Sequence, residues 1–334
     1  MSDPQCVLVT GGAGYIGSHT VRQLVEVGRQ VVVLDSLELG HANAVLDAEL
    51  VQGDIADEAL VRDVCRRHGV TQVVHFAAYK SVGESMSSPS KYWLNNVAGT
   101  VHLVEAMLAE GVRQIVFSSS CSVYGTPAVV PVDETAAIHP ESIYAETKAM
   151  SEKVLGWYGV THGLRSVCLR YFNAAGASAD GRIGEDWATS ANLVPLVMKA
   201  ALRQGPPVQI FGTDYPTPDG TGIRDYIHVD DLAHAHVLSL DHLGRGGDTI
   251  ALNVGTGRGS SVHEVIAATE RISGVDVPQV VSPRRAGDPV SSYADARLTR
   301  EVLGWEATRG LDDIIASAWS WHSAHPEGYP SSSR

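Results

Sequence analysis

An apolar run followed by three evenly spaced glycines constrains the fold of this chain most. Cys6–Thr10 is short and rich in β-branched residues, which is typical of a buried parallel strand. Gly11, Gly14 and Gly17 follow at the spacing G-x-x-G-x-x-G. Such glycines permit a tight turn, let the backbone approach a ligand and let a helix pack on the strand. The helix expected next would present backbone N–H groups that suit a pyrophosphate.

A second apolar stretch favours the interpretation of the glycine turn as a ligand-binding turn over that of a simple tight turn. Gln30–Asp35 reads as another strand, and Asp35 comes 18 residues after Gly17. A carboxylate about 20 residues beyond the last glycine accepts hydrogen bonds from the ribose 2′-OH of NAD, and it would repel the 2′-phosphate of NADP. We therefore expect NAD as the cofactor. The competing interpretation of Asp35 is a solvated turn residue.

Charge and cysteine use narrow the class of protein. The net charge of −13 argues against nucleic acid as a partner. The longest apolar runs fall short of the roughly 18 residues of a membrane span, and residues 1–5 do not resemble the start of a signal peptide. The four cysteines, Cys6, Cys65, Cys121 and Cys168, are widely spaced and predict buried thiols rather than disulfides or metal ligands. We expect a cytoplasmic protein with no membrane partner and no metal.

Apolar strands alternate with amphipathic helices through the first half of the chain. The expected strands are 6–10, 30–35, 72–77, 113–118 and 166–170, and the expected helices are 16–27, 58–68, 92–109 and 143–158. This order predicts an α/β fold with a doubly wound parallel sheet of the Rossmann type. Ligands of such sheets lie beyond the carboxyl ends of the strands.

The second half predicts a smaller C-terminal α/β domain for a substrate. Helices are expected near 193–203, 262–272, 296–303 and 311–321, and strands at 208–211 and 249–254. Asp230 is placed to cap a helix that runs through Leu240. The expected domains are 1–172 plus about 226–256 for the dinucleotide, and about 173–225 plus 257–330 for the substrate. We expect the tail 330–334 to be frayed.

A tyrosine and a lysine four residues apart are candidates for catalysis. Tyr144 and Lys148 would share one face of a helix, where the ammonium would lower the tyrosine pKa and allow it to act as a general base. Ser120 is the last of three consecutive serines at the end of the strand 113–118, and it lies 24 residues before Tyr144. A serine, a tyrosine and a lysine beside a nicotinamide can oxidise a secondary alcohol. Each short motif alone also fits surface residues.

Several longer stretches together resemble the extended short-chain dehydrogenases/reductases, and among them the UDP-glucose 4-epimerases. The resemblance covers about residues 6–329. It is carried by VTGGAGYIGSH (9–19), GDI (53–55), HFAAYKSVGES (75–85), NNVAGT (95–100), SSSCSVYG (118–125), RYFN (170–173) and DGTGIRDYIHV (219–229).

The resemblance implies a role for each matching position. Ser120, Tyr144 and Lys148 would be catalytic. The cofactor would be held by Gly11, Gly14, Tyr15, Ile16, Gly17, Asp35, Asp54, Ile55, Phe76, Ala77, Lys80, Asn95, Tyr144, Lys148 and Tyr171. The substrate would be held by Lys80, Ser120, Tyr144, Asn173, Asn192, Leu193, Phe211, Arg224, Arg285, Asp288 and Ser292.

This similarity implies NAD-dependent 4-epimerisation of a UDP-hexose, UDP-galactose to UDP-glucose, through a 4-keto sugar. Arg224 and Arg285 would provide the cationic clamp that an acidic chain needs for a pyrophosphate; the alternative for both is a surface salt bridge. Ser292 falls where family members carry a bulky tyrosine or a small residue near the sugar C2 substituent. A serine there predicts that UDP-GlcNAc and UDP-GalNAc also turn over, unless Ser292 only faces solvent.

Other readings remain open at this point. The run Trp187–Leu193 departs from the proline-containing stretch usual in the family and leaves Asn192 and Leu193 less secure. Cys121 and Ser122 stand where a 4,6-dehydratase needs a carboxylate pair, which disfavours that activity. A UDP-xylose or UDP-glucuronate epimerase, or a non-catalytic NAD-sensing regulator, stays possible. The resemblance also suggests a homodimer built from the helices near 92–109 and 143–158.

Overall fold

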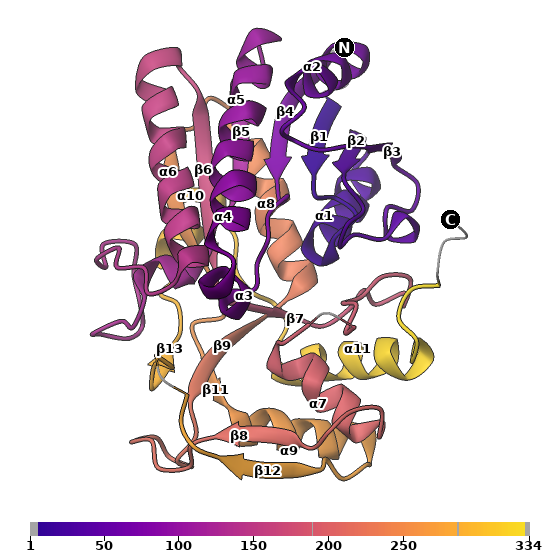
Figure 1. The fold of residues 1–334 in the computed structure, drawn as a ribbon, viewed down its shortest axis with the longest axis vertical. Helices are drawn as coiled ribbons and strands as arrows, with labels where there is room; N and C mark the ends of the chain where they lie inside the picture. Colours follow the sequence, from indigo (N-terminus) through magenta and orange to yellow (C-terminus); the bar gives the residue numbers. More distant parts are fainter. Residues whose placement is uncertain (1–5, 189, 286, 331–334) are drawn as a thin grey trace.

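A computed structural model describes residues 6–188, 190–285 and 287–330, so residues 331–334 of the expected tail lie outside the description. The molecule has two stacked parts (Figure 1). The larger part holds a sheet with helices on both sides. The smaller part, below it in this view, contains short strands together with α7, α9 and α11.

The large sheet has seven parallel strands in the order β10-β6-β5-β4-β1-β2-β3. The predicted doubly wound Rossmann sheet is therefore confirmed. Its strands are β1 (Cys6–Thr10), β2 (Gln30–Asp35), β3 (Glu49–Gln52), β4 (Val70–His75), β5 (Gln114–Ser118), β6 (Arg165–Tyr171) and β10 (Ile250–Val254).

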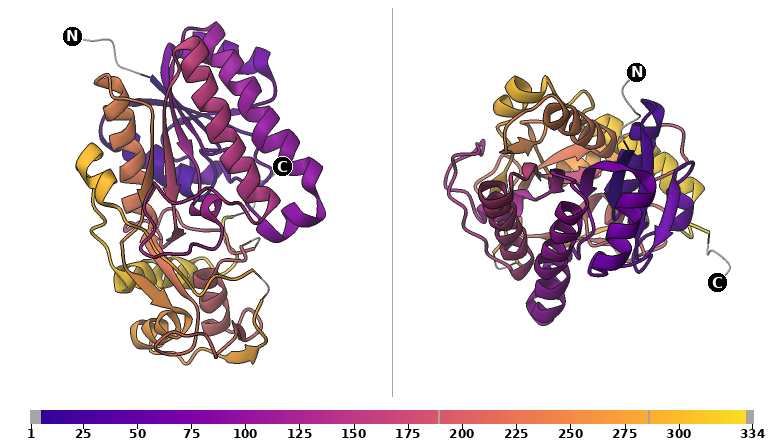
Figure 2. Two further views of the ribbon diagram at one scale, coloured as in Figure 1. Left: turned by 90° about the vertical axis from the view of Figure 1, so that its left-hand side faces the viewer. Right: turned by 90° about the horizontal axis from the view of Figure 1, so that it is seen from above.

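Alternate side chains of β1 point to opposite faces of the sheet and define two cores. Val7 and Val9 pack with α1 and α8, whereas Cys6 and Leu8 pack with α2, α5 and α6. Figure 2 shows helices on both sides of the sheet. The helices of this part are α1 (Tyr15–Glu26), α2 (Glu58–His68), α3 (Val82–Ser87), α4 (Pro89–Tyr92), α5 (Gly99–Ala109), α6 (Ile143–His162), α8 (Val229–Gly244) and α10 (Arg297–Leu303), with the short turns η1 (Ala42–Ala44), η2 (Trp93–Ala98) and η3 (Cys121–Tyr124).

The smaller part has a core of its own, where Val197 and Met198 of α7 meet Ile314 and Ile315 of α11. One sheet has the path β11-β9-β13 with β7 also paired to β9, and a second sheet pairs β8 with β12. The elements are β7 (Asn173–Ala175), α7 (Leu193–Ala201), β8 (Val208–Phe211), β9 (Ile223–His228), β11 (Gly259–Ser261), α9 (Val262–Ser273), β12 (Gln279–Ser282), β13 (Ser291–Ser292) and α11 (Leu311–Ala324).

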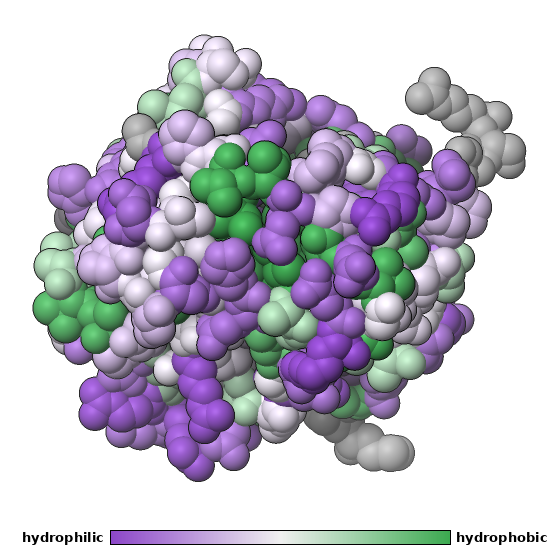
Figure 3. Space-filling view, turned by 90° about the horizontal axis from the view of Figure 1, so that it is seen from below, coloured by the Kyte–Doolittle hydropathy of each residue, from purple (hydrophilic) through white to green (hydrophobic). Residues whose placement is uncertain are grey.

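The outer surface of this smaller part mixes hydrophobic and hydrophilic side chains. Seen from below, its hydrophobic side chains form small groups separated by hydrophilic ones (Figure 3). No helix in the described ranges is both long and apolar enough to cross a membrane.

Two expectations about local structure are wrong. The segment 92–109 is not one regular helix, because Trp93–Ala98 forms a π-helical turn before α5. Asp230 does not cap α8. The cap is His228, whose Nδ1 accepts a hydrogen bond from the Asp230 backbone N–H at 3.1 Å, so Asp230 lies in the first turn.

Candidate active site

The glycine turn after β1 is built by close backbone approach. Gly11 has φ +71°, and a Cβ there would lie 2.5 Å from the Ala77 backbone nitrogen. A Cβ on Gly17 would lie 2.2 Å from the Gly11 carbonyl oxygen. The helix α1 starts at Tyr15 with neither a side-chain cap nor an acidic residue in its first turn. Its first N–H groups can therefore receive an anionic pyrophosphate.

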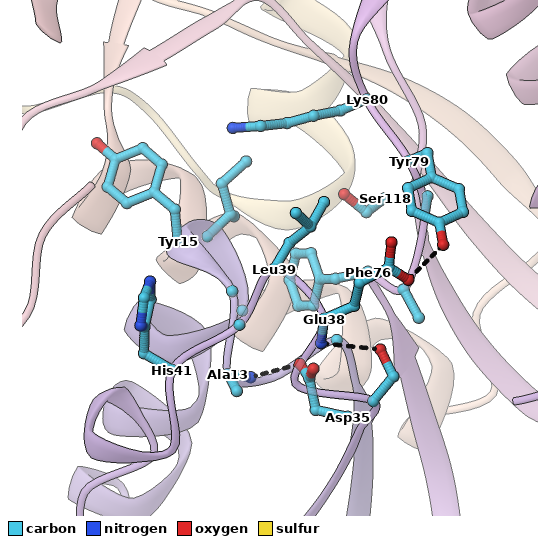
Figure 4. Close-up of a pocket in the computed structure, with 18 of the residues that line it drawn as sticks. Ala13, Tyr15, Asp35, Glu38, Leu39, His41, Phe76, Tyr79, Lys80 and Ser118 are labelled. Carbon is cyan, nitrogen blue, oxygen red and sulfur yellow. Dashed lines mark hydrogen bonds between the residues drawn. The ribbon is translucent and has the colours of Figure 1, made fainter. Parts of the chain in front are cut away.

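Asp35 ends β2 at the floor of the same pocket. Its carboxylate accepts a hydrogen bond from the backbone N–H of Ala13 at 2.9 Å (Figure 4) and another from the backbone N–H of Leu37, also at 2.9 Å. The side chain is buried, and burial raises the pKa of Asp35 above its ordinary value while the two N–H groups oppose that rise. Asp35 is thus held rigidly where a ribose would lie, rather than solvated in a turn.

All positions expected to hold the cofactor line this one pocket. It runs from the glycine turn along the carboxyl ends of the parallel strands, and the Lys80 side chain extends across it toward Tyr15 (Figure 4). Those lining residues are Gly11, Gly14, Tyr15, Ile16, Gly17, Asp35, Asp54, Ile55, Phe76, Ala77, Lys80, Asn95, Tyr144, Lys148 and Tyr171. The glycine turn, the uncapped helix and the buried carboxylate together fit an NAD molecule.

Tyr144 and Lys148 enter the pocket from the first turns of α6, which Ser142 caps. The Lys148 Nζ donates to the Ser118 carbonyl oxygen at 2.7 Å and lies 6.0 Å from the centre of the Tyr144 ring. Ser120 is buried at the end of the neighbouring strand, and its side chain acts on the pKa of Tyr144. The three candidate catalytic residues therefore converge.

The expected lowering of the Tyr144 pKa is wrong. Burial raises the pKa of Tyr144 above its ordinary value, and the Ser120 side chain opposes that rise. Burial also lowers the pKa of Lys148 to about 7. A low-dielectric site disfavours both charged forms, so the distance between the two residues in the sequence could not give the sign.

A second cluster lies in the smaller part and contains the two expected arginines. Asp288 joins them, with one oxygen 2.9 Å from the Arg285 Nε and the other 3.7 Å from an Arg224 terminal nitrogen. The Arg285 guanidinium lies 4.5 Å from the centre of the Phe211 ring. Ser292 of β13 is directly opposite Arg224 of β9. Five of the expected substrate residues are thus brought together.

Three further substrate candidates come from β7 and the start of α7. Asn173 is exposed at the start of β7 and donates to the Asp225 carbonyl oxygen at 3.1 Å. Asn192 occupies the N-cap position of α7 without a side-chain capping bond and donates to Glu185 at 3.0 Å, and Leu193 is the first helical residue. The charges of Asp225 and Arg224 act on the pKa of Cys121 in opposite directions. Burial is the larger effect, and it raises this pKa to about 12 and keeps the thiol protonated.

Sequence reasoning missed a carboxylate that joins the two regions. Glu185 lines the pocket, is buried, and lies 3.5 Å from the Lys80 Nζ. Beside it, Asp186 pairs with His41 at 2.8 Å, and the His41 ring stacks on Tyr329 with centroids 4.6 Å apart. The only signal in the sequence is that two adjacent acidic residues, Glu185 and Asp186, follow a glycine-rich loop. The other contacts join residues far apart in the chain.

The comparisons with known proteins agree with this geometry. Residues 7–255 match the NAD dependent epimerase/dehydratase family. A UDP-glucose 4-epimerase of Halalkalibacterium halodurans is 48% identical over 97% of each chain. A solved UDP-glucose-4-epimerase from Stenotrophomonas maltophila, with bound NAD and formylated UDP-arabinopyranose, superposes with a TM-score of 0.94 at 44% identity over 97% of this chain and 99% of that one. One from Brucella ovis in complex with NAD gives 0.93 at 45% over 94% and 97%.

The fold and the pocket define a dinucleotide-binding protein of the Rossmann type. The chain belongs to the NAD dependent epimerase/dehydratase family.

Proposed function

We propose that this protein interconverts UDP-galactose and UDP-glucose by NAD-dependent 4-epimerisation through a 4-keto sugar. One observation carries the proposal. Tyr144 and Lys148 are buried in the pocket that all the expected cofactor residues line, and the Arg224–Arg285 cluster lies in the adjoining part of the molecule. The named relatives support the same conclusion.

The chain's own residues divide the chemistry as follows. When bound, NAD supplies a nicotinamide that takes up the C4 hydrogen with its electron pair and later returns it. The Tyr144 phenolate takes the proton of the 4-hydroxyl, becoming the neutral phenol, and gives the proton back when the C4 hydrogen returns, while the Ser120 hydroxyl holds the same oxygen. Protonated Lys148 stabilises the phenolate that forms. Burial disfavours the phenolate, so Tyr144 depends on the positive charge of Lys148 to act as a base.

Arg224 and Arg285 serve as the grip on the pyrophosphate. Arginine can donate two parallel hydrogen bonds to phosphate oxygens, and Asp288 holds both guanidinium groups near one point. A firm hold there with a loose hold on the hexose lets the 4-keto sugar turn and present its other face. Asn173, Asn192, Leu193 and Phe211 complete the proposed site together with Lys80 and Ser292.

Ser292 favours an additional substrate class. Its side chain is small, half-buried, and paired with Arg224 across two strands. That leaves room beside the sugar C2 position for an N-acetyl group. We therefore include UDP-GlcNAc and UDP-GalNAc among the substrates.

The domain division, the location and the assembly complete the proposal. Residues 1–172 and about 226–256 would bind NAD in a cytoplasmic enzyme, and the rest would bind the UDP-sugar. We place a homodimer contact on α5 and α6, because Trp157 and Val160 of α6 are 70% and 77% exposed. Trp157→Glu should convert a dimer to a monomer in light scattering, and a monomeric wild type would refute the contact.

The test of function uses purified protein and UDP-galactose with no added NAD, followed by NMR of the sugar protons. Appearance of UDP-glucose supports both the reaction and a cofactor carried through purification. Tyr144→Phe should lose most of the rate, whereas Tyr158→Phe on the same helix, where the hydroxyl bonds only Glu105 among described residues, should retain it. No conversion after adding NAD would refute the proposal and direct the search to UDP-xylose, UDP-glucuronate or a regulatory role.

A further inference from the structure

A largely buried carboxylate lies one helical turn beyond the lysine of the pocket. Tyr144, Lys148 and Glu152 are spaced by four residues on α6 and therefore lie on one face of the helix. The Glu152 side chain is only 11% exposed. The function proposed above gives Glu152 no role, although a buried carboxylate is costly unless it is paired.

Glu152 is held by donors from two strands of the sheet. The Arg170 Nε on β6 lies 3.0 Å and 3.2 Å from its two oxygens, and a terminal nitrogen of the same arginine donates at 2.5 Å. The Ser119 hydroxyl, directly after β5, donates at 2.5 Å. Arg170 is fixed in turn by the Tyr124 hydroxyl at 3.0 Å. These contacts lock the carboxylate in place.

Among the described residues, few groups other than Glu152 place a negative charge near Lys148. Its Nζ is bonded to a neutral carbonyl group and lies 4.8 Å from the Phe117 ring. Burial lowers the pKa of His75 to about 3 and raises the pKa of the Cys168 thiol, so both are neutral near pH 7. Several titratable or charged groups of the described residues surround Lys148 and its immediate neighbours. They are Tyr144 and Glu152 on α6, His75 on β4, and Cys168, Arg170 and Tyr171 on β6.

We propose that Glu152 is a positioning residue, whose clamped negative charge keeps Lys148 in its ammonium form during the reaction. The inference rests on the proposed function, because only an ammonium at Lys148 can support the Tyr144 phenolate. Burial alone works against that charge, and Glu152 opposes the effect of burial on the pKa of Lys148. Arg170 sets how much of the Glu152 charge reaches the lysine.

Removing Glu152 and removing Arg170 should shift the pKa of Lys148 in opposite directions. Glu152→Gln keeps the shape and an acceptor oxygen but leaves Arg170 as an unbalanced cation, so Lys148 should lose its proton at lower pH. Arg170→Gln leaves Glu152 as an unbalanced anion, so Lys148 should hold its proton to higher pH. A purely structural clamp would give two damaged enzymes with no opposite shifts.

The direct test is an NMR titration of Lys148 in the full-length protein with selectively ¹³C,¹⁵N-labelled lysine. The chain has five lysines, Lys80, Lys91, Lys148, Lys153 and Lys199, so Lys148→Arg assigns the resonance by its loss. The titration midpoint should fall by about one pH unit in Glu152→Gln and rise in Arg170→Gln. Glu146→Gln, two residues from Lys148 and on a different face of α6, is the matched control and should leave it unchanged.

Enzyme kinetics provides the second readout. The rate should fall as the pH rises through the Lys148 pKa, and this basic limb should move down in Glu152→Gln while KM for UDP-galactose stays within about twofold. Glu152→Asp keeps the charge and should keep the limb near its wild-type position even if stability falls. If Glu152→Gln does not fold, the upward shift in Arg170→Gln still decides the question. An unchanged lysine titration, or shifts of the same sign in both variants, would overturn the proposal. A wild type that turns over no UDP-sugar, with the titration shifts still present, would overturn the function alone.

Discussion

The glycine turn after β1 allows a sharp steric prediction at Gly17. An alanine Cβ there would lie 2.2 Å from the Gly11 carbonyl oxygen and 2.8 Å from the Gly12 Cα, against ordinary contacts of 3.4 Å or more. Both neighbours are backbone atoms, so the turn must move by about an ångström to accept the methyl group. We expect Gly17→Ala to lower the free energy of unfolding by about 3 kcal/mol, the upper part of the range for overpacking.

Differential scanning calorimetry and the bound cofactor measure the effect. The melting temperature should fall by about 4 °C, and the NAD released on acid denaturation should drop several-fold, because the displaced turn no longer presents the first N–H groups of α1. The matched control is Gly156→Ala in α6, where a Cβ meets no described atom within 4 Å and helix propensity favours alanine by about 1 kcal/mol. Equal stability and equal NAD content in the Gly17 variant would refute the steric reasoning.

Three further predictions concern ligand choice. Asp35→Ser should weaken NAD binding at least about tenfold and raise the relative affinity for NADP, because it removes the carboxylate that repels a 2′-phosphate; titration of both dinucleotides against apoprotein checks this, and an unchanged preference contradicts it. Ser292→Tyr should abolish turnover of UDP-GalNAc while UDP-galactose turnover stays within about threefold, and equal losses on both sugars would count against the pocket assignment. Arg285→Met should raise KM for UDP-galactose about tenfold or more with little change in kcat, whereas Arg271→Met, a surface arginine paired with Asp312, should leave both unchanged.

The sheet was predictable from sequence because its strands are short apolar runs ended by small or polar residues. β1 and β2 have the predicted bounds, and the carboxyl-end rule correctly brings Asp35, Ala77 and Ser118 to one pocket. The motif positions converge for the same reason. Local sequence patterns were therefore sufficient to predict the fold and the position of the pocket.

Features that depend on tertiary contacts were not predictable. The π-helical turn at Trp93–Ala98 is held by Asn96, whose side chain is bonded to both backbone groups of Tyr79. β9 reads as a polar segment, yet Asp225 is buried by hydrogen bonds to the backbone at Thr256, Gly257 and Ala294. Such partners lie far apart in the chain.

The electrostatics of the site also depend on burial. A tyrosine and a lysine four residues apart suggest mutual stabilisation of their charges, but enclosure by β4, β5 and β6 disfavours both charges. The Glu152–Arg170 pair that counters this effect joins α6 to β6 and leaves no periodic signal in the sequence.

Transfer of the C4 hydrogen of the sugar is the central claim, and isotope retention tests it most directly. UDP-galactose deuterated at C4 is incubated with the protein in ordinary water, and the UDP-glucose formed is analysed by NMR and mass spectrometry. The account predicts that the label stays at C4 of the product, since the same hydrogen is removed and returned inside a closed pocket. Loss of the deuterium to solvent, or product labelled at another carbon, would contradict it.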